Sequence, residues 1–309
     1  MWAGGSAKRP QVAKQSTTLS PRDLARAIDV SVSSVKRWAD DGQLEVIRTS
    51  GGHRRIRLDE AIRFVREAGH DVVRPDLLGV STPTRVSERV RGPTTGSLLE
   101  ALLASDGRAA RHMIVLAYVQ GSSVAGLCDG VIREALEDIG QRWHEEGPKA
   151  IALEHYAVDT CVQALMEIRG LMQTPGRAPL AVGGAGPGDP YVLPSLMASI
   201  ALMDAGFRVL NLGADVPTQA VVASVQAHAP AFVWRSYSLE MPAPSLATDL
   251  RSISRALPAK AGIAFGGRGV PRSRQTPENA SYFGSMTELT GFARGRHRPP
   301  RKRSPGKGA

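Results

Sequence analysis

The spacing of apolar and polar residues changes along the chain, and each spacing indicates a different kind of structure. Between residues 18 and 69, two short helical patterns precede two stretches that suit strands. Ser20 and Ser31 predict the starts of the two helices, because serine is a common N-cap. Two strands and a closing helix are expected over 44–48, 54–57 and 59–68. This order predicts an α+β winged helix-turn-helix over 18–69.

The middle of the chain has helical spacing. Residues 70–96 contain several prolines and show little periodicity, which indicates a linker. Over 97–175, apolar residues recur at helical intervals and three short polar breaks interrupt them. This pattern predicts a four-helix bundle.

Short apolar stretches then alternate with helical ones over 178–292. Such alternation is typical of right-handed βαβ units, in which helices cover a parallel sheet. The expected strands are 180–183, 209–212, 231–234 and 261–265. The fold class predicted for the whole chain is therefore multidomain, and its last part is an α/β domain of the flavodoxin or Rossmann-like kind.

The 309 residues carry a net charge of +10. Ten positive charges lie in two end segments without acids, 1–17 and 293–309, which are poor in apolar residues and are expected to be disordered. No apolar run approaches the roughly 20 residues that cross a bilayer, so a cytoplasmic protein without membrane contact is expected. Cys128 and Cys161 are far apart and are expected to be buried thiols rather than a disulfide or metal site.

The second helix and the two strands after it contain the candidate DNA-binding residues. Val32, Val35 and Trp38 are expected to point inward, and the residues between them outward, as in a recognition helix. Gly51 and Gly52 suit a tight wing turn. The candidate groove contacts are Ser33, Ser34, Lys36 and Arg37, and the candidate backbone contacts are Arg48, Thr49, His53, Arg54 and Arg55. The sequence from Thr49 to Arg55, Thr-Ser-Gly-Gly-His-Arg-Arg, resembles the wing of MerR-type DNA-binding domains, which implies that double-stranded operator DNA is the partner.

A second resemblance concerns the helical region. Ten residues lie between Trp143 and the pair Glu154-His155. This spacing is similar to the Trp-x9-Glu-His cap of the CarH/LitR group of cobalamin photoreceptor repressors, with one residue added. In that family the cap covers the upper face of cobalt. Without the family, Trp143 reads as a core anchor, and Glu154 and His155 as a surface pair.

A third resemblance lies in the α/β region. Asp189, Tyr191, Ser236, Gly266 and Gly267 follow the register of the Asp-x-His, Ser-x-Leu and Gly-Gly signature of cobalamin-binding domains. The resemblance implies that the aspartate orients a histidine cobalt ligand and that the small residues leave room for the displaced nucleotide tail. Tyr191 replaces the histidine, and a phenol is a poor ligand at neutral pH. Cobalamin binding then requires His155 to ligate cobalt from above, or the cofactor's own base to stay on cobalt; no other metal site is predicted.

These patterns predict a transcriptional regulator, a repressor, that is not an enzyme and that forms a homo-oligomer, either a dimer or a tetramer. The resemblance implies adenosylcobalamin as cofactor, with light-driven disassembly of the oligomer. Two alternatives remain. One is a corrinoid-carrying component of a methyltransferase, and the other is a ligand-free regulator controlled by a protein partner.

Overall fold

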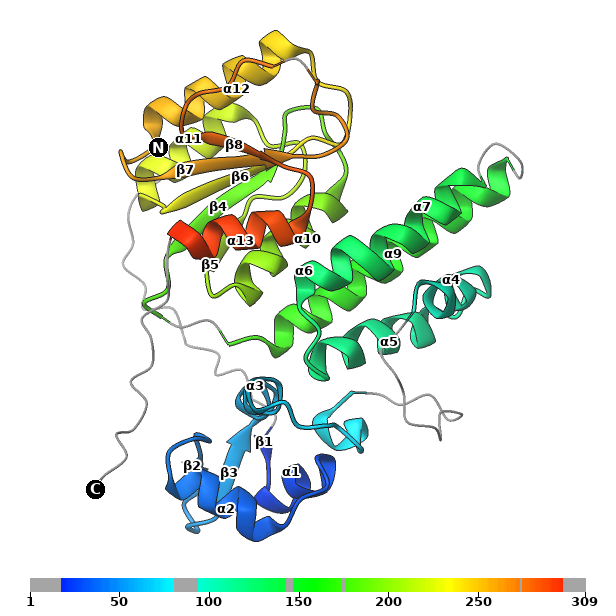
Figure 1. Ribbon diagram of the computed structural model, residues 1–309, viewed down its shortest axis with the longest axis vertical. Helices are drawn as coiled ribbons and strands as arrows, with labels where there is room; N and C mark the ends of the chain where they lie inside the picture. The colour runs from blue at the N-terminus through cyan, green and yellow to red at the C-terminus, as the bar shows by residue number, and fades with distance from the viewer. Residues whose placement is uncertain (1–17, 81–93, 143–146, 174–175, 273, 297–309) are drawn as a thin grey trace, which may run out of the picture. The chain divides into compact units, whose positions relative to one another are not determined.

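The computed structural model describes residues 18–80, 94–142, 147–173, 176–272 and 274–296 (Figure 1). The expected disorder of 1–17 and of 297–309 lies outside these residues. The chain divides into two compact units, Met1–Gly79 and Val80–Ala309, which are described separately.

The first unit contains three helices and a small antiparallel sheet. Helix α1 (Pro21–Ala27) begins in a capping box, in which Ser20 and Asp23 hydrogen-bond each other's backbone N–H, and Ser31 caps α2 (Val32–Asp40). Strand β3 (Arg54–Arg57) lies between β1 (Thr18–Leu19) and β2 (Ile47–Arg48). Helix α3 (Leu58–Ala68) and a 3₁₀ turn, η1 (Pro75–Leu78), follow.

The structure corrects three details of this unit. Strand β1 was not expected from the sequence, and β2 covers only the last two residues of its expected range. Val32, expected to point inward, is exposed because it stands in the first turn of α2, before the helix reaches the core at Val35. The beginning of the expected linker packs onto this unit, since the N–H groups of Val73 and Arg74 donate to the carbonyl of Ala27 at 2.8 and 3.1 Å.

Helices form the first part of the second unit. They are α4 (Thr95–Leu103), α5 (Gly107–Val119), α6 (Val124–Leu127), the π-helical stretch η2 (Cys128–Ile132), α7 (Arg133–Gln141) and α9 (Pro148–Leu171). Tyr156 of α9 ties α9 to the start of α5: its hydroxyl accepts from Gly107 N–H at 2.6 Å and donates to the carbonyl of Ser105 at 2.7 Å. As expected, Cys128 and Cys161 are buried free thiols, and burial raises the pKa of the Cys161 thiol to about 12.

A parallel five-stranded sheet forms the second part of this unit. Its strands are β4 (Leu180–Ala185), β5 (Arg208–Asn211), β6 (Phe232–Ser236), β7 (Gly262–Gly266) and β8 (Ala280–Phe283). Their order across the sheet is β5-β4-β6-β7-β8, so the chain reverses its direction of winding between β4 and β6. The parallel-sheet class expected from the sequence is therefore confirmed. Ligands of such sheets bind beyond the carboxyl ends of the strands at this switch point.

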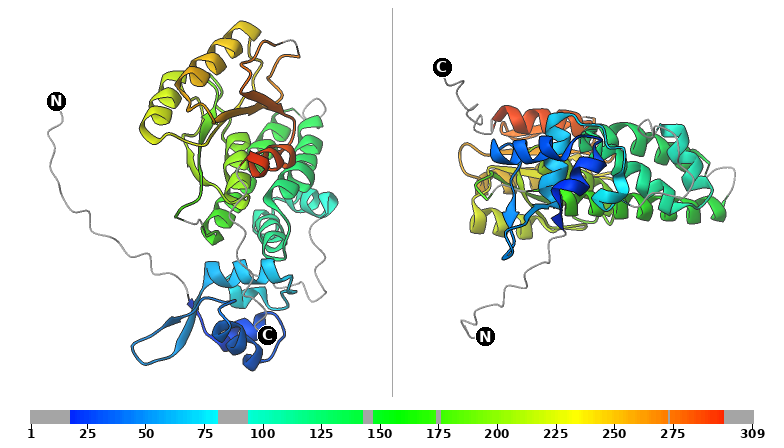
Figure 2. Two further views of the ribbon diagram at one scale, coloured as in Figure 1. Left: turned by 60° about the vertical axis from the view of Figure 1, so that its left-hand side comes forward. Right: turned by 90° about the horizontal axis from the view of Figure 1, so that it is seen from below.

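Four helices cover the two faces of the sheet (Figures 1 and 2). Helices α10 (Val192–Asp204) and α13 (Met286–Arg296) share a core with one face, and α11 (Thr218–His228) and α12 (Ala243–Ala256) with the other. Strand β8 and helix α13 were missed by the sequence prediction, and the expected disordered tail from 293 is wrong up to residue 296. Strand β8 is short and half-buried, which weakens its apolar pattern.

Two carboxylates join the helices to the sheet. Asp129 of η2 accepts from the N–H groups of Met286 and Thr287 at 2.7 and 2.8 Å, at the start of α13. In the opposite direction, Asp204 at the end of α10 accepts from the N–H of Val124 at 3.0 Å. The helical part thus supplies Asp129 to the N-terminus of α13, and the sheet part supplies Asp204 to the N-terminus of α6. The first N–H groups of a helix have no partner within the helix.

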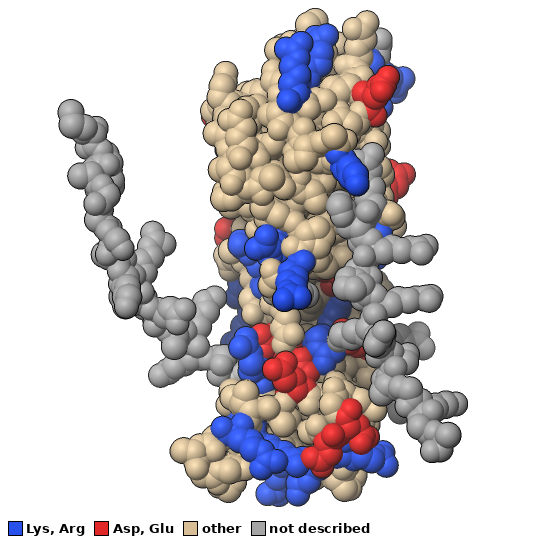
Figure 3. All heavy atoms as spheres, turned by 90° about the vertical axis from the view of Figure 1, so that its left-hand side faces the viewer, with Lys and Arg blue, Asp and Glu red and all other residues tan. Residues whose placement is uncertain are grey.

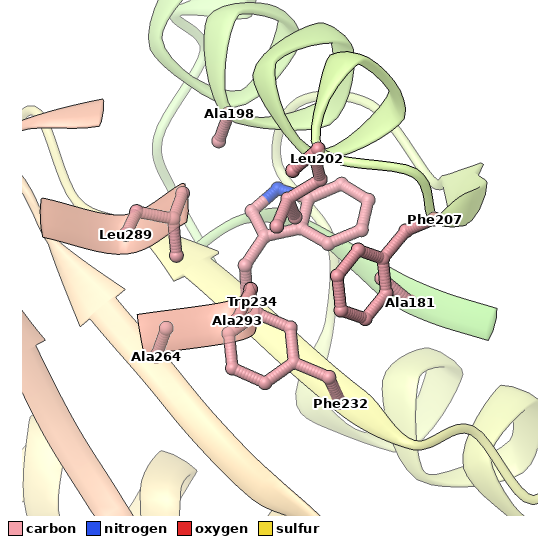
Figure 4. Close-up of a cluster of buried hydrophobic side chains, with 10 residues drawn as sticks. Ala181, Ala198, Leu202, Phe207, Phe232, Trp234, Ala264, Leu289 and Ala293 are labelled. Atoms are coloured by element: carbon pink, nitrogen blue, oxygen red, sulfur yellow. The ribbon is translucent and has the colours of Figure 1, made fainter. Parts of the chain in front are cut away.

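Trp234 of β6 occupies the centre of the core beneath α10 (Figure 4). Its side chain is 2% exposed, and its Nε1 donates to Ser195 Oγ of α10 at 3.2 Å. A Cβ added to Gly183, its neighbour on β4, would overlap the indole ring. The absence of a side chain at Gly183 on β4 therefore leaves the space that the indole of Trp234 on β6 occupies.

Candidate functional site

The exposed face of α2 carries the predicted groove contacts. Ser33, Lys36 and Arg37 are exposed, and Ser34 is half-buried. The Ser31 hydroxyl caps the helix by accepting from Ser34 N–H at 3.0 Å, and it also lies 2.7 and 3.0 Å from the hydroxyls of Ser33 and Ser34. The serines are thus held at the start of the helix, and the two cations extend beyond them.

The loop between β2 and β3 is a tight turn that projects from the first unit (Figure 2, left). Thr49 N–H donates to the carbonyl of His53 at 3.0 Å, and Gly52 N–H donates to the carbonyl of Thr49 at 2.9 Å. Gly52 has φ +77°, a left-handed conformation that glycine adopts without strain. The local sequence therefore holds Arg48 and His53 on an ordered hairpin.

The basic side chains of the first unit fall into two groups, and lysines and arginines gather visibly over its surface (Figure 3). Arg54 is braced within the unit: it forms an ion pair with Asp40 at 2.6 Å and donates to the carbonyl of Lys36 at 3.3 Å. Arg57, Arg63 and Arg74 also pair with acids. By contrast, four predicted contact residues have side chains that form no hydrogen bond or ion pair with any residue in the described part of the chain: Lys36, Arg37, Arg48 and Arg55. The charge of Arg55 does act on the carboxylate of Asp23.

In the second unit, Asp189 lies at the switch point of the sheet. Its side chain is 3% exposed. One carboxylate oxygen accepts from Tyr191 N–H at 3.1 Å, and the other accepts from Ser238 N–H at 2.6 Å. Asp189 therefore ties the loop after β4 to the loop after β6, using both oxygens on backbone donors.

The residues around Asp189 differ in exposure and in hydrogen bonding. Tyr191 is the N-cap residue of α10 and is 44% exposed. The hydroxyls of Ser236 and Ser238 are buried and have no hydrogen-bond partner among the described residues. A Cβ added to Gly266 would overlap the carbonyl oxygen of Phe283, and one added to Gly267 the carbonyl oxygen of Tyr237. Close backbone approach within the sheet thus already requires these two glycines.

A buried polar cluster near the same edge was missed by the sequence analysis. Arg235 is 1% exposed; its Nε and Nη2 donate to Asp249 of α12 at 3.0 and 3.1 Å, and the carbonyls of Ala185 and Val216 accept its other hydrogen bonds. Thr218 and Tyr237 also donate to Asp249. Burial, and then the negative charge of Asp249, raise the pKa of the Tyr237 phenol, so this phenol stays protonated. An arginine directly after the expected strand 231–234 was the sequence signal for this cluster.

The predicted cap residues are only partly described. Glu154 is half-buried and His155 exposed on α9, and neither side chain forms a hydrogen bond or ion pair with another described residue. Trp143 lies outside the described residues. The described residues contain no group of three His, Cys, Asp or Glu side chains that suits a metal ion.

The residues around Asp189 leave room for a corrinoid only outside the carboxyl edge of the sheet. Both oxygens of Asp189 are used by backbone N–H groups, and Tyr191 offers no nitrogen to cobalt. The space beside Gly266 and Gly267 holds neighbouring backbone, and Trp234 fills the core beneath α10. The residues therefore do not fit a cofactor whose base leaves cobalt and inserts as a tail.

Comparison with known proteins yields structural neighbours only. No family model and no curated protein matches the chain. The solved structures similar to it include the monomethylamine corrinoid protein of Methanosarcina barkeri, with 18% identity over 63% of this chain and 94% of that one, at a TM-score of 0.48.

Two further structures are similar at a TM-score of 0.33. A cobalamin-binding protein from Desulfitobacterium hafniense DCB-2 has 17% identity over 66% of this chain and 98% of that one. The methanol:cobalamin methyltransferase complex of Methanosarcina barkeri has 16% identity over 73% of this chain and 92% of that one. The names of all three refer to a corrinoid or to cobalamin.

Proposed function

We propose that the chain is a cytoplasmic transcriptional regulator of MerR type, a repressor that binds double-stranded operator DNA. In this proposal, 18–69 is a winged helix-turn-helix, 97–175 a four-helix bundle, and 178–292 a cobalamin-binding-like domain through which the chain forms a dimer or tetramer. The protein is not an enzyme. Among the described helices, none is long and apolar enough to cross a membrane.

The unpaired cations of α2 and the wing carry this proposal. Two other arginines of the same unit, Arg57 and Arg74, are paired with Asp59 and Asp76. Among the described residues, no carboxylate forms an ion pair with Lys36, Arg37, Arg48 or Arg55, which lie on α2 and on the hairpin of the first unit. Phosphates of a duplex would neutralise these charges and release bound counterions.

Binding to DNA is measured by fluorescence anisotropy on duplexes selected from a random library. Affinity is expected to fall as salt rises, and Arg55→Ala is expected to lower the slope of log affinity against log salt by about 0.9, the contribution of one phosphate contact. Arg74→Ala, which removes an arginine already paired with Asp76, should leave the slope unchanged. A wild-type chain without affinity for any duplex would rule out the proposal.

We further propose that adenosylcobalamin associates with the carboxyl edge of the sheet while its own base stays on cobalt. Two features of this edge support binding there: the unpartnered hydroxyls of Ser236 and Ser238, and the exposed apolar side chains of Tyr191, Val192 and Leu239. The filled core around Trp234 supports retention of the base. When bound, the cofactor would supply a light-sensitive cobalt–carbon bond.

The purified protein is incubated with adenosylcobalamin in the dark, freed of unbound cofactor, and analysed by absorption and gel filtration before and after green light. The base-on spectrum is expected to coelute with the protein. The elution volume should not change on illumination, because no protein ligand couples cobalt to the fold. Tyr191→His alone should leave the spectrum base-on, since Asp189 and Trp234 are unchanged. Absence of corrin absorbance would exclude the cofactor but not DNA binding.

The rival function is a corrinoid-carrying component of a methyltransferase, and a ligand-free regulator controlled by a protein partner is a further alternative. The methyltransferase component would accept a methyl group on cobalt and bind no duplex. The unpaired cations on α2 and the wing favour the regulator, and the anisotropy measurement separates the two functions.

A further inference from the structure

A groove lined by basic residues lies in the first unit where the start of α1, the start of α2 and the wing meet. Its wall contains five side chains of basic residue type, and none of its lining residues is acidic. The lining residues are Ser20, Pro21, Arg22, Val32, Lys36, Gly52, His53, Arg54 and Arg55. We call this surface the basic groove. Three of its basic residues were candidates on the wing and one on α2, whereas Arg22 was not anticipated.

Asp23, the acidic residue next to Arg22, forms its side-chain hydrogen bonds with Ser20 rather than with Arg22. Asp23 accepts from Ser20 N–H at 3.1 Å and from the Ser20 hydroxyl at 2.7 Å, which completes the capping box of α1. These hydrogen bonds lower the pKa of Asp23, so its carboxylate is charged and committed to the cap. Asp23 is not among the residues that line the groove.

The side chain of Arg22 is exposed and forms no hydrogen bond or ion pair with any residue that the structure describes. Its position is well defined because Pro21 and the capping box hold the first turn of α1. The opposite wall is also defined, because the ion pair of Arg54 with Asp40 braces the wing against α2. Arg54 thus shapes the groove. The side chains of Arg22 and Lys36 have no ion-pair partner among the described residues, whereas Arg55 lies within reach of the charge of Asp23.

We propose that the basic groove holds a phosphodiester of the duplex backbone and that Arg22 contacts this phosphate. The inference rests on the proposed DNA-binding function and adds a contact from α1 to those of α2 and the wing. A phosphate suits this surface because charge-assisted bonds from guanidinium groups to phosphate oxygens are strong and directional. Such a contact fixes the register of the protein on DNA and carries no base preference.

The test compares Arg22→Ala with Arg26→Ala in the full chain. Arg26 is a matched control, because it is exposed on the same helix and does not line the groove. Both variants lose one positive charge, so long-range attraction to DNA changes equally. Anisotropy titrations on the selected duplex and on an unrelated duplex of the same length are recorded over a range of salt.

Arg22→Ala is expected to reduce the salt slope by about 0.9, which corresponds to about an eightfold loss of affinity near 0.1 M salt. The loss should be the same on both duplexes, and Arg22→Lys should recover most of it. Arg26→Ala should keep the wild-type slope. Thermal unfolding of each variant verifies that α1 is intact.

Equal slopes for Arg22→Ala and Arg26→Ala would overturn the assignment of Arg22, while wild-type binding would leave the proposed function in place. A loss on the selected duplex alone would also overturn it, because a phosphate contact acts on every sequence. Failure of the wild-type chain to bind either duplex would instead refute the proposed function.

Discussion

Replacing Asp249 with asparagine is expected to lower the free energy of unfolding of the second unit by about 3–5 kcal/mol. Asp249 faces the guanidinium of Arg235, which is 1% exposed and forms its only ion pair among the described residues with this carboxylate. An amide keeps the shape but removes the charge, so a buried cation loses its counter-charge. The hydroxyls of Thr218 and Tyr237 also lose a charged acceptor. Urea unfolding of the full chain, followed by circular dichroism, measures the change in midpoint.

Two variants test whether the effect arises from the uncompensated charge. Arg255→Ala removes an exposed arginine from the same helix and should change stability by less than about 0.5 kcal/mol. The double variant Arg235→Met with Asp249→Leu should be more stable than Asp249→Asn, because no charge is left buried. A wild-type midpoint for Asp249→Asn would contradict the arrangement of this cluster.

Truncating Trp234 to alanine is expected to cost about 3–5 kcal/mol, the range for removal of a large aromatic side chain from a core. The indole ring packs among Ala181, Leu202 and Phe207 and fills the space left by Gly183 (Figure 4). Its removal leaves a cavity beneath α10 and takes away the donor to the buried Ser195 hydroxyl. Urea unfolding measures the loss.

Trp234→Phe separates packing from the hydrogen bond. It retains most of the apolar volume but loses the five-membered part of the indole together with Nε1, so its cost should be below that of Trp234→Ala. Equal costs for the two variants would show that the ring does not fill the space as described. Ser195→Ala keeps the ring in place but removes the acceptor of Nε1 and the hydrogen bond to Asn211 Oδ1, so its cost should also be below that of Trp234→Ala.

Local signals predicted most of the elements but not their partners. Serine caps located the starts of α1 and α2, and the change from helical to alternating spacing located the parallel sheet, because capping and period act within a few residues. Strands β1 and β8 were missed, since each is short and owes its existence to hydrogen bonds with a strand distant in sequence. The beginning of the linker was misjudged for the same reason: its N–H groups pair with Ala27.

For the candidate sites, too, the sequence predicted the positions of residues along the chain but not their partners. Spacing alone predicted that Asp189 and Ser236 lie at one edge of the sheet, because the carboxyl ends of parallel strands share that edge. It could not predict that both oxygens of Asp189 bind backbone N–H groups. Nor could it predict that Arg54 braces the wing, since the partner, Asp40, ends a different element.

By itself, the sequence of this chain determined most of its helices and strands in their order, the parallel-sheet class of its last part, and which cations stand on α2 and the wing. These properties follow from spacing, capping and charge, which neighbouring residues express without the rest of the fold. Only the tertiary structure decided which cations lack a carboxylate, which glycines are required by close backbone approach, and that Trp234 fills the core beneath α10. Pairing and filled volume depend on residues that are remote in sequence and meet only when the chain is packed.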